Sequence, residues 1–233
     1  MLPSDVIGRT IIGSMKTNIE NRIQSQEQPS ISRILTRNII CVAASALALA
    51  LAATLVGIDA VVLENGVSEG SLTETTQEWL LMFATLGALR RAWHDKSQRG
   101  FALLLAGLFG AMFFRELDGF LDDFVYHGSW KFFVAPWLVL CVVLALRYGK
   151  TIFSGAADFV RGRPYIVITI GLLIVLVFSR ILGHKSIWLA LQDDPPLRTV
   201  KNAVEEGIEL LGYFLIAGGM APYGWRSRFT DKP

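Results

Sequence analysis

Long apolar runs separated by short charged segments make up most of the chain from residue 39 onward. A helix needs about 20 apolar residues to cross about 30 Å of hydrocarbon, and each run is close to that length. The pattern predicts an all-α, polytopic integral membrane protein with six transmembrane helices, at approximately 39–62, 73–92, 100–120, 132–148, 165–183 and 200–222. The first run is too long, and begins too late, for the core of a cleaved signal peptide.

The segment before the first run has a different pattern. Apolar residues recur every fourth position, which gives a slanted apolar stripe, at Ile7, Ile11, Met15, Ile19 and Ile23. Such a stripe is typical of an amphipathic helix lying on an anionic leaflet, and a partner-binding tail is the alternative. The expected organisation is an amphipathic tail and linker at 1–38, a six-helix bundle at 39–222 and a short tail at 223–233.

The composition agrees with a membrane protein. Only 18% of the residues are charged and 52% are hydrophobic, whereas soluble domains carry about 25% charged residues. Cys41 and Cys141 both lie inside apolar runs, so we expect buried thiols and no disulfide framework. Nothing in the sequence indicates nucleic-acid binding.

The distribution of charge predicts the orientation. If both termini are cytoplasmic, most of the 22 Lys and Arg residues fall on the cytoplasmic side, as the positive-inside rule requires. The basic residues of the opposite half are Arg115, Lys131, Arg180, Lys185, Arg198 and Lys201. This bias favours a cytoplasmic N-terminus and C-terminus. We expect a bacterial inner (plasma) membrane, and an organelle membrane, with the outer side facing the lumen, is the alternative.

The acids show the reverse distribution. Most of the 20 Asp and Glu residues fall in the outer half, and the cytoplasmic exceptions are Asp5, Glu20, Glu27, Asp95, Asp158 and Asp231. Acids contribute little to topology, so this excess needs a different cause. Glu74 and Glu78 begin the second helix, where the positive end of the helix dipole favours them.

The third and sixth predicted helices carry acids that the helix dipole does not explain. Arg115, Asp118 and Asp122 form one stripe at the C-terminal end of the third helix, with Glu116 and Asp123 beside it. The dipole disfavours negative charge at that end, so a cation, a proton or Arg115 must compensate for it.

On the sixth helix, the residues at 202, 206, 209 and 213 share one face: Asn202, Glu206, Glu209 and Tyr213. Glu209 directly precedes the apolar run LLGYFLIAGG, so we expect it to lie within the membrane boundary. An intramembrane carboxylate marks a functional site by default.

These acids predict an outward-facing polar cavity, and its leading interpretation is a metal-dependent hydrolase or transferase acting on a lipid or lipid-linked substrate. The candidate metal ligands are Glu78, Glu116, Asp118, Asp122, His127 and His184. The residue types do not distinguish among Zn, Mn, Fe, Mg and Ca. Glu206 or Glu209 would act as the general base, and Arg115 would bind a phosphate or carboxylate.

Two other functions fit the same residues. The acids and Arg115 could form a structural ion-pair network or a surface for a partner subunit, or they could line the path of a cation- or proton-coupled transporter. Ala44, Ala48 and Ala52 form a small-residue face that suits close packing in an oligomer or with a partner subunit.

Overall fold

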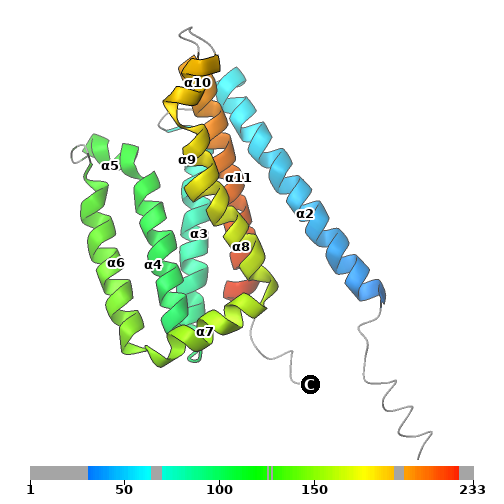
Figure 1. Ribbon diagram of the computed structural model, residues 1–233, viewed down its shortest axis with the longest axis vertical. Helices are drawn as coiled ribbons and strands as arrows, with labels where there is room; N and C mark the ends of the chain where they lie inside the picture. Colours follow the sequence, from blue (N-terminus) through cyan, green and yellow to red (C-terminus); the bar gives the residue numbers. More distant parts are fainter. Residues whose placement is uncertain (1–30, 64–69, 125, 127, 192–196, 226–233) are drawn as a thin grey trace, which may run out of the picture. The chain divides into compact units, whose positions relative to one another are not determined.

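The computed structural model describes residues 31–63, 70–124, 126, 128–191 and 197–225, and every regular element in these ranges is helical (Figure 1). This confirms the all-α prediction. The expected amphipathic stripe at 7–23 lies outside the described residues. Three described segments are long and apolar enough to cross a membrane: Asn38–Val62, Trp130–Arg147 and Arg163–Leu182.

The chain divides into two units, residues 1–46 and 47–233. The described part of the first unit is the beginning of α2 (Ile31–Gly57), whose apolar side chains, such as Ile39 and Val42, are exposed. The second unit contains the rest of α2, a short π-helix η1 (Ile58–Val62) and all other helices.

The second unit is a bundle of packed helices. Its centre is α3 (Leu72–His94), which packs against α4 (Arg99–Glu116) on one side and α11 (Leu197–Trp225) on the other (Figure 1). Beyond α4 lies α6 (Trp130–Arg147). Beyond α11 lies a continuous segment of three elements: α8 (Arg163–Leu173), the π-helix η2 (Ile174–Phe178) and α9 (Ser179–Leu182).

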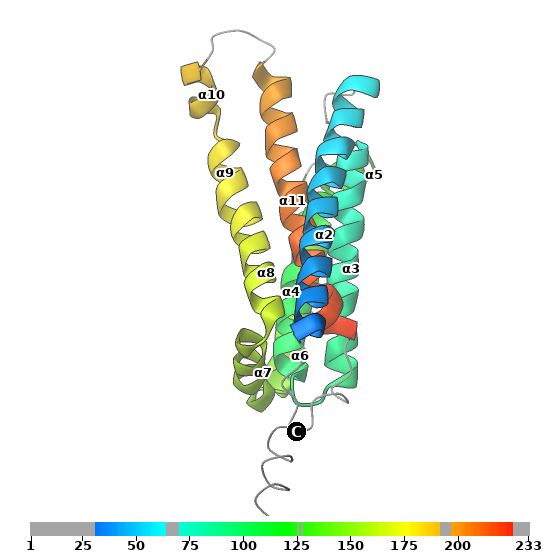
Figure 2. The same cartoon turned by 90° about the vertical axis from the view of Figure 1, so that its right-hand side faces the viewer.

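Short helices connect the long helices at both ends of the bundle. We call the end with α5 (Asp118–Phe124) and α10 (Lys185–Leu191) the acidic end, and the end with α7 (Lys150–Arg161) the basic end (Figure 2). Each predicted apolar segment overlaps one long helix or the α8–η2–α9 series. The third predicted helix is interrupted at Leu117, between α4 and α5, and α7 was not predicted at all.

The core of the second unit is packed closely enough that two helices meet backbone to backbone. The helices α3, α4, α8 and α11 bury Leu81, Phe109, Ile216 and Met220 between them. A Cβ built on Gly171 would lie 2.7 Å from the carbonyl oxygen of Gly212. Because lipid is as apolar as a side chain, such close packing of small residues is what holds membrane helices together.

The start of α3 is fixed by two sets of capping contacts. Ser71 Oγ accepts a hydrogen bond from Glu74 N at 3.1 Å, as an N-cap does. Asp59 in η1 is fully buried and accepts from Leu72 N at 3.0 Å, Thr73 N at 2.8 Å and Thr73 Oγ1 at 2.6 Å. Asp59 therefore joins the start of η1 to the first turn of α3.

The second π-helix, η2, immediately precedes two polar residues of α9. Its wider turn changes the register of the following side chains, and such insertions are frequent at functional sites. Ser179 Oγ lies 2.6 Å from the carbonyl oxygen of Val175, within this turn. Ser179 and Arg180 are thereby presented toward α11.

Candidate functional site

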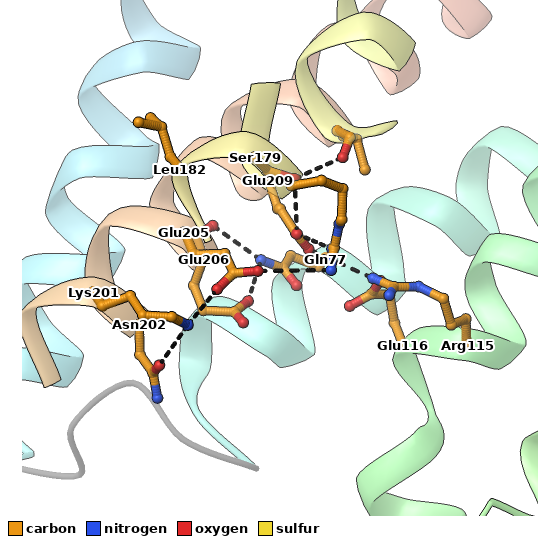
Figure 3. Close-up of polar contacts among 12 residues, drawn as sticks. Gln77, Arg115, Glu116, Ser179, Leu182, Lys201, Asn202, Glu205, Glu206 and Glu209 are labelled. Atoms are coloured by element: carbon orange, nitrogen blue, oxygen red, sulfur yellow. Dashed lines mark hydrogen bonds and ion pairs between the residues drawn. The ribbon is translucent and has the colours of Figure 1, made fainter. Parts of the chain in front are cut away.

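Polar side chains from α3, α4, α9 and α11 meet near the acidic end of the bundle (Figure 3). We call this group the Glu209 cluster; it comprises Gln77, Arg115, Glu116, Ser179, Arg180, Lys201, Glu205, Glu206, Glu209 and Tyr213.

The carboxylate of Glu209 lies between two arginines. Its Oε1 atom pairs with Arg180 Nη2 and lies 3.0 Å from Ser179 Oγ, and its Oε2 atom lies 3.7 Å from Arg115 Nη2. The Glu209 side chain is only 3% exposed. A buried carboxylate is costly unless it is paired and hydrogen-bonded, and here both of its oxygens have basic partners.

Glu116 is the second buried acid of the cluster. Its Oε1 atom lies 2.6 Å from Arg115 Nη2 and accepts a hydrogen bond from the hydroxyl of Tyr213 at 2.8 Å. Arg115 thus joins two carboxylates that belong to different helices, Glu116 on α4 and Glu209 on α11.

Glu205 forms the edge of the cluster toward the start of α11. Its Oε2 atom lies 2.8 Å from Lys201 Nζ, one helical turn away, and its Oε1 atom lies 3.6 Å from Arg180 Nη1. Arg180 therefore joins Glu205 and Glu209, as Arg115 joins Glu116 and Glu209.

Glu206 has a neutral partner instead of a cation. Gln77, which is fully buried on α3, donates from Nε2 to the side-chain Oε2 and to the backbone oxygen of Glu206, both at 3.1 Å. This pair ties α3 to α11 at the level of the Glu209 cluster.

A cavity of about 400 Å³ adjoins the cluster. Ten side chains from α4, α6, η2, α9 and α11 line it: Leu108, Ala111, Met112, Arg115, Trp130, Val134, Val175, Leu176, Arg180 and Tyr213. The side chains of Arg115 and Arg180 are 40% and 43% exposed, whereas Glu116 and Glu209 are 9% and 3% exposed. Both arginines thus belong to the cavity lining and are more exposed than the two glutamates with which they pair, neither of which lines the cavity.

The three predicted catalytic residues come together in the structure. Arg115 contacts Glu209 directly, and Glu206 lies one turn away on α11, bonded to Gln77. Arg115 and Glu116 also contact each other, although the helical pattern assigned them to neighbouring stripes.

The predicted metal ligands have varied surroundings. Glu116 contacts Arg115 and Tyr213, Asp122 accepts a hydrogen bond from Gly128 N at 2.8 Å, and exposed His184 lies 2.7 Å from Ser186 Oγ. Glu78 is half-buried on α3, and Asp118 begins α5.

The position of His127 lies outside the described residues. Among the side chains that the structure describes, no three from His, Cys, Asp and Glu form a group able to hold a metal ion. The metal centre stays a prediction from the sequence.

Sequence reasoning did not select Arg180, Ser179 or Gln77 as site residues. The signal for Arg180 was present, because a basic residue stands inside the apolar run LLIVLVFSRILG, where charge is expensive and marks function. Ser179 and Gln77 carry no such signal, since isolated hydroxyl and amide side chains are common in membrane helices.

No protein-family model matches the chain, and neither the curated proteins nor the solved structures give a significant match. The Glu209 cluster and its cavity are therefore the features of the molecule that bear on its function.

Proposed function

We propose that the chain is a six-span protein of the bacterial inner membrane that binds an anionic ligand between Arg115 and Arg180, with the acidic end facing the periplasm. The alternating direction of the long helices supports six spans. The concentration of Arg90, Arg91, Arg99, Arg147 and Arg163 at the basic end supports a cytoplasmic position for that end.

One observation carries the binding proposal: Arg115 and Arg180, whose guanidinium groups share Glu209, both belong to the lining of the same cavity. Arginine presents five N–H donors in a planar fork that matches carboxylate and phosphate groups. The contacts of Arg115 with Glu116 and Glu209 use only its Nη2 atom, so its Nε and Nη1 atoms take no part in them. An anion entering the cavity would meet the two guanidinium groups before any carboxylate.

The surroundings would strengthen such binding. Away from water, a charge-assisted hydrogen bond is stronger, because the local dielectric constant is low. The carboxylates fix the orientation of both arginines before the ligand arrives, which lowers the entropy cost of binding. Glu209 also competes with the ligand for the same cations, and this competition would make binding reversible.

The test compares ligands with one chain and different head groups. Dodecyl phosphate, laurate and dodecanol are added to the purified protein in neutral-detergent micelles, and one-to-one complexes are measured by native mass spectrometry. We expect the two anions to bind at least about tenfold more tightly than dodecanol, which corresponds to about 1.4 kcal/mol.

The variants Arg115→Gln and Arg180→Gln should each remove this preference for charge. Lys185→Gln is the matched control, because it removes one positive charge from an exposed residue at the same end of the bundle. Equal binding of dodecanol and both anions to the unaltered protein would refute the proposal.

A structural role is the second candidate, and it too has a specific observation in its favour. Arg115, Arg180 and Lys201 are each paired with a glutamate of the cluster. In that case no probe would bind with a preference for charge. The same arginine substitutions would lower the thermal transition temperature under either role, so binding alone distinguishes the two.

A further inference from the structure

The cavity beside the Glu209 cluster is polar at one end and apolar along the rest of its length. On α4 its lining proceeds from Leu108 through Ala111 to Arg115, and on η2 and α9 from Val175 to Arg180. Both helices run toward the acidic end in this direction (Figure 1). Arg115 and Arg180 are therefore the lining residues nearest the outer end on these two walls, and aliphatic residues lie deeper in the bundle.

The third wall, on α6, shows the same change from polar to apolar lining. Because α6 runs away from the acidic end, the change follows the chain in the opposite direction. Trp130 is the first residue of α6, at the acidic end, and Val134 follows one turn deeper. Tryptophan is enriched where the head groups of a bilayer meet its hydrocarbon. Along all three walls the lining residues thus change from polar or interfacial at the acidic end to aliphatic deeper in the bundle. A lipid in that leaflet changes from head group to hydrocarbon tail in the same direction.

Side chains of both α6 and η2 line the cavity. These elements pack on different neighbours, α6 on α4 and η2 on α11. Leu176 lines the cavity and is nevertheless 52% exposed. The next residues, Val177 and Phe178, are also exposed on the outer surface. A ligand in the surrounding hydrocarbon would therefore reach the cavity past apolar side chains, without crossing water.

The dimensions fit the part of one acyl chain nearest its head group. From Leu108 to Arg115 the α4 wall rises about 10 Å along its axis, at about 1.5 Å per residue. The volume of about 400 Å³ lies near the lower limit of about 300–1,000 Å³ for ligand pockets. Deeper in the bundle, Trp137 Nε1 donates to the backbone oxygen of Ala106 at 3.2 Å, which joins α6 to α4.

We propose that the ligand is a single-chain anionic amphiphile, such as a fatty acid or a monoalkyl phosphate, taken from the membrane leaflet at the acidic end. Its head group lies between Arg115 and Arg180, and its chain lies along Ala111, Val134 and Val175. This inference rests on the proposed anion-binding function and adds that the ligand has a single hydrocarbon tail.

The test varies the tail while the head group stays a phosphate. Dodecyl phosphate and two-chain dioleoyl phosphatidic acid are titrated into the protein in neutral-detergent micelles, with affinity expressed per mole fraction of amphiphile. Inorganic phosphate is added as a competitor. We expect dodecyl phosphate to bind at least about tenfold more tightly than phosphatidic acid, and inorganic phosphate not to displace it.

Two substitutions on α6 provide a matched pair. Val134→Trp fills the cavity, whereas Val139→Trp places the same side chain on the outer surface, where Val139 is 62% exposed. We expect the first variant to weaken the binding of dodecyl phosphate at least about tenfold, and the second to change it less than about twofold. Ala111→Phe on α4 fills the same cavity and replaces Val134→Trp if that variant lacks a cooperative thermal transition.

The outcomes separate this inference from the function on which it rests. If phosphatidic acid binds as tightly as dodecyl phosphate, or if Val134→Trp and Val139→Trp behave alike, the single-chain inference is wrong and the anion site stands. If dodecanol binds as tightly as dodecyl phosphate, the anion site itself is wrong, and the inference falls with it.

Discussion

Arg180 of α9 and Glu209 of α11 form an ion pair in which the acid is buried and the base is not. The Glu209 side chain is 3% exposed and the Arg180 side chain is 43% exposed. The acid therefore depends on the base for its charge compensation, while the guanidinium group stays accessible from the cavity. Because of this difference in exposure, we expect the two residues to contribute differently to stability and to binding.

Removal of Arg180 should destabilise the bundle. Loss of one partner of a buried ion pair costs about 3–5 kcal/mol. Because Arg115 still lies near Glu209, we expect roughly 2–4 kcal/mol for Arg180→Gln. The thermal transition in neutral detergent measures this loss, and Lys185→Gln should change stability by less than about 0.5 kcal/mol.

The double variant Arg180→Gln/Glu209→Gln should recover part of the loss, since it leaves no buried carboxylate without its partner. A double-mutant cycle gives the coupling energy directly. Additive effects of the two substitutions would show that the pair contributes nothing beyond its separate side chains.

Asp59 should matter for the start of α3. It accepts three hydrogen bonds from Leu72 and Thr73 while fully buried, so Asp59→Ala leaves these donors unsatisfied. We expect a loss of about 1–3 kcal/mol, with faster hydrogen exchange at the amides of residues 72 and 73. Asp59→Asn keeps one acceptor oxygen and should be intermediate. Unchanged exchange in Asp59→Ala would contradict the capping role.

Two glycines of α11 should respond in opposite ways to alanine. A Cβ on Gly212 would meet the backbone oxygen of Gly171 at 3.0 Å, whereas a Cβ on Gly218 would meet nothing within 4 Å. Gly212→Ala should therefore lower the thermal transition temperature by forcing α8 away from α11. Gly218→Ala should leave the free energy of unfolding unchanged or raise it by up to about 1 kcal/mol. Equal effects would mean that the two helices do not depend on this close approach.

The apolar runs were sufficient to predict the all-α fold and the approximate ranges of the long helices, because a run of about 20 apolar residues is typical of a membrane-spanning helix. They could not predict α7 or the two π-helices. These elements depend on how the chain packs against neighbouring helices. The sequence IVLVF of η2, for example, has no feature that distinguishes it from an ordinary α-helix.

The candidate site was predicted in part. The pattern selected Arg115, Glu206 and Glu209, and the structure places all three in or beside one cluster. The pairing of Glu209 with Arg180 could not be read from one helix, since it joins residues 29 positions apart. Similarly, the hydroxyl of Tyr213 was placed on the acidic face of its helix, but its bond to Glu116 depends on the packing of α4 and α11 around α3.

The proposed orientation of the bundle predicts which exposed positions react with a reagent added outside the cell. In a background without Cys41 and Cys141, a cysteine replaces either Ser186 at the acidic end or Ser97 at the basic end; both positions are exposed. A membrane-impermeant maleimide added to intact cells should label Ser186→Cys alone. Both variants should react after the cells are lysed. Labelling of Ser97→Cys in intact cells would reverse the orientation, and labelling of both would contradict six spans.

The central claim is that Arg115 and Arg180 hold an anion in competition with Glu209, and Glu209→Gln tests it most directly. The substitution removes the competing charge and keeps a side chain of similar size beside Ser179. We predict that dodecyl phosphate binds this variant about tenfold more tightly than the unaltered protein, with no change for dodecanol. Glu78→Gln, which removes an acid of α3 outside the cavity lining, should have little effect. If Glu209→Gln binds dodecyl phosphate no more tightly than Glu78→Gln does, the two arginines are not an anion site.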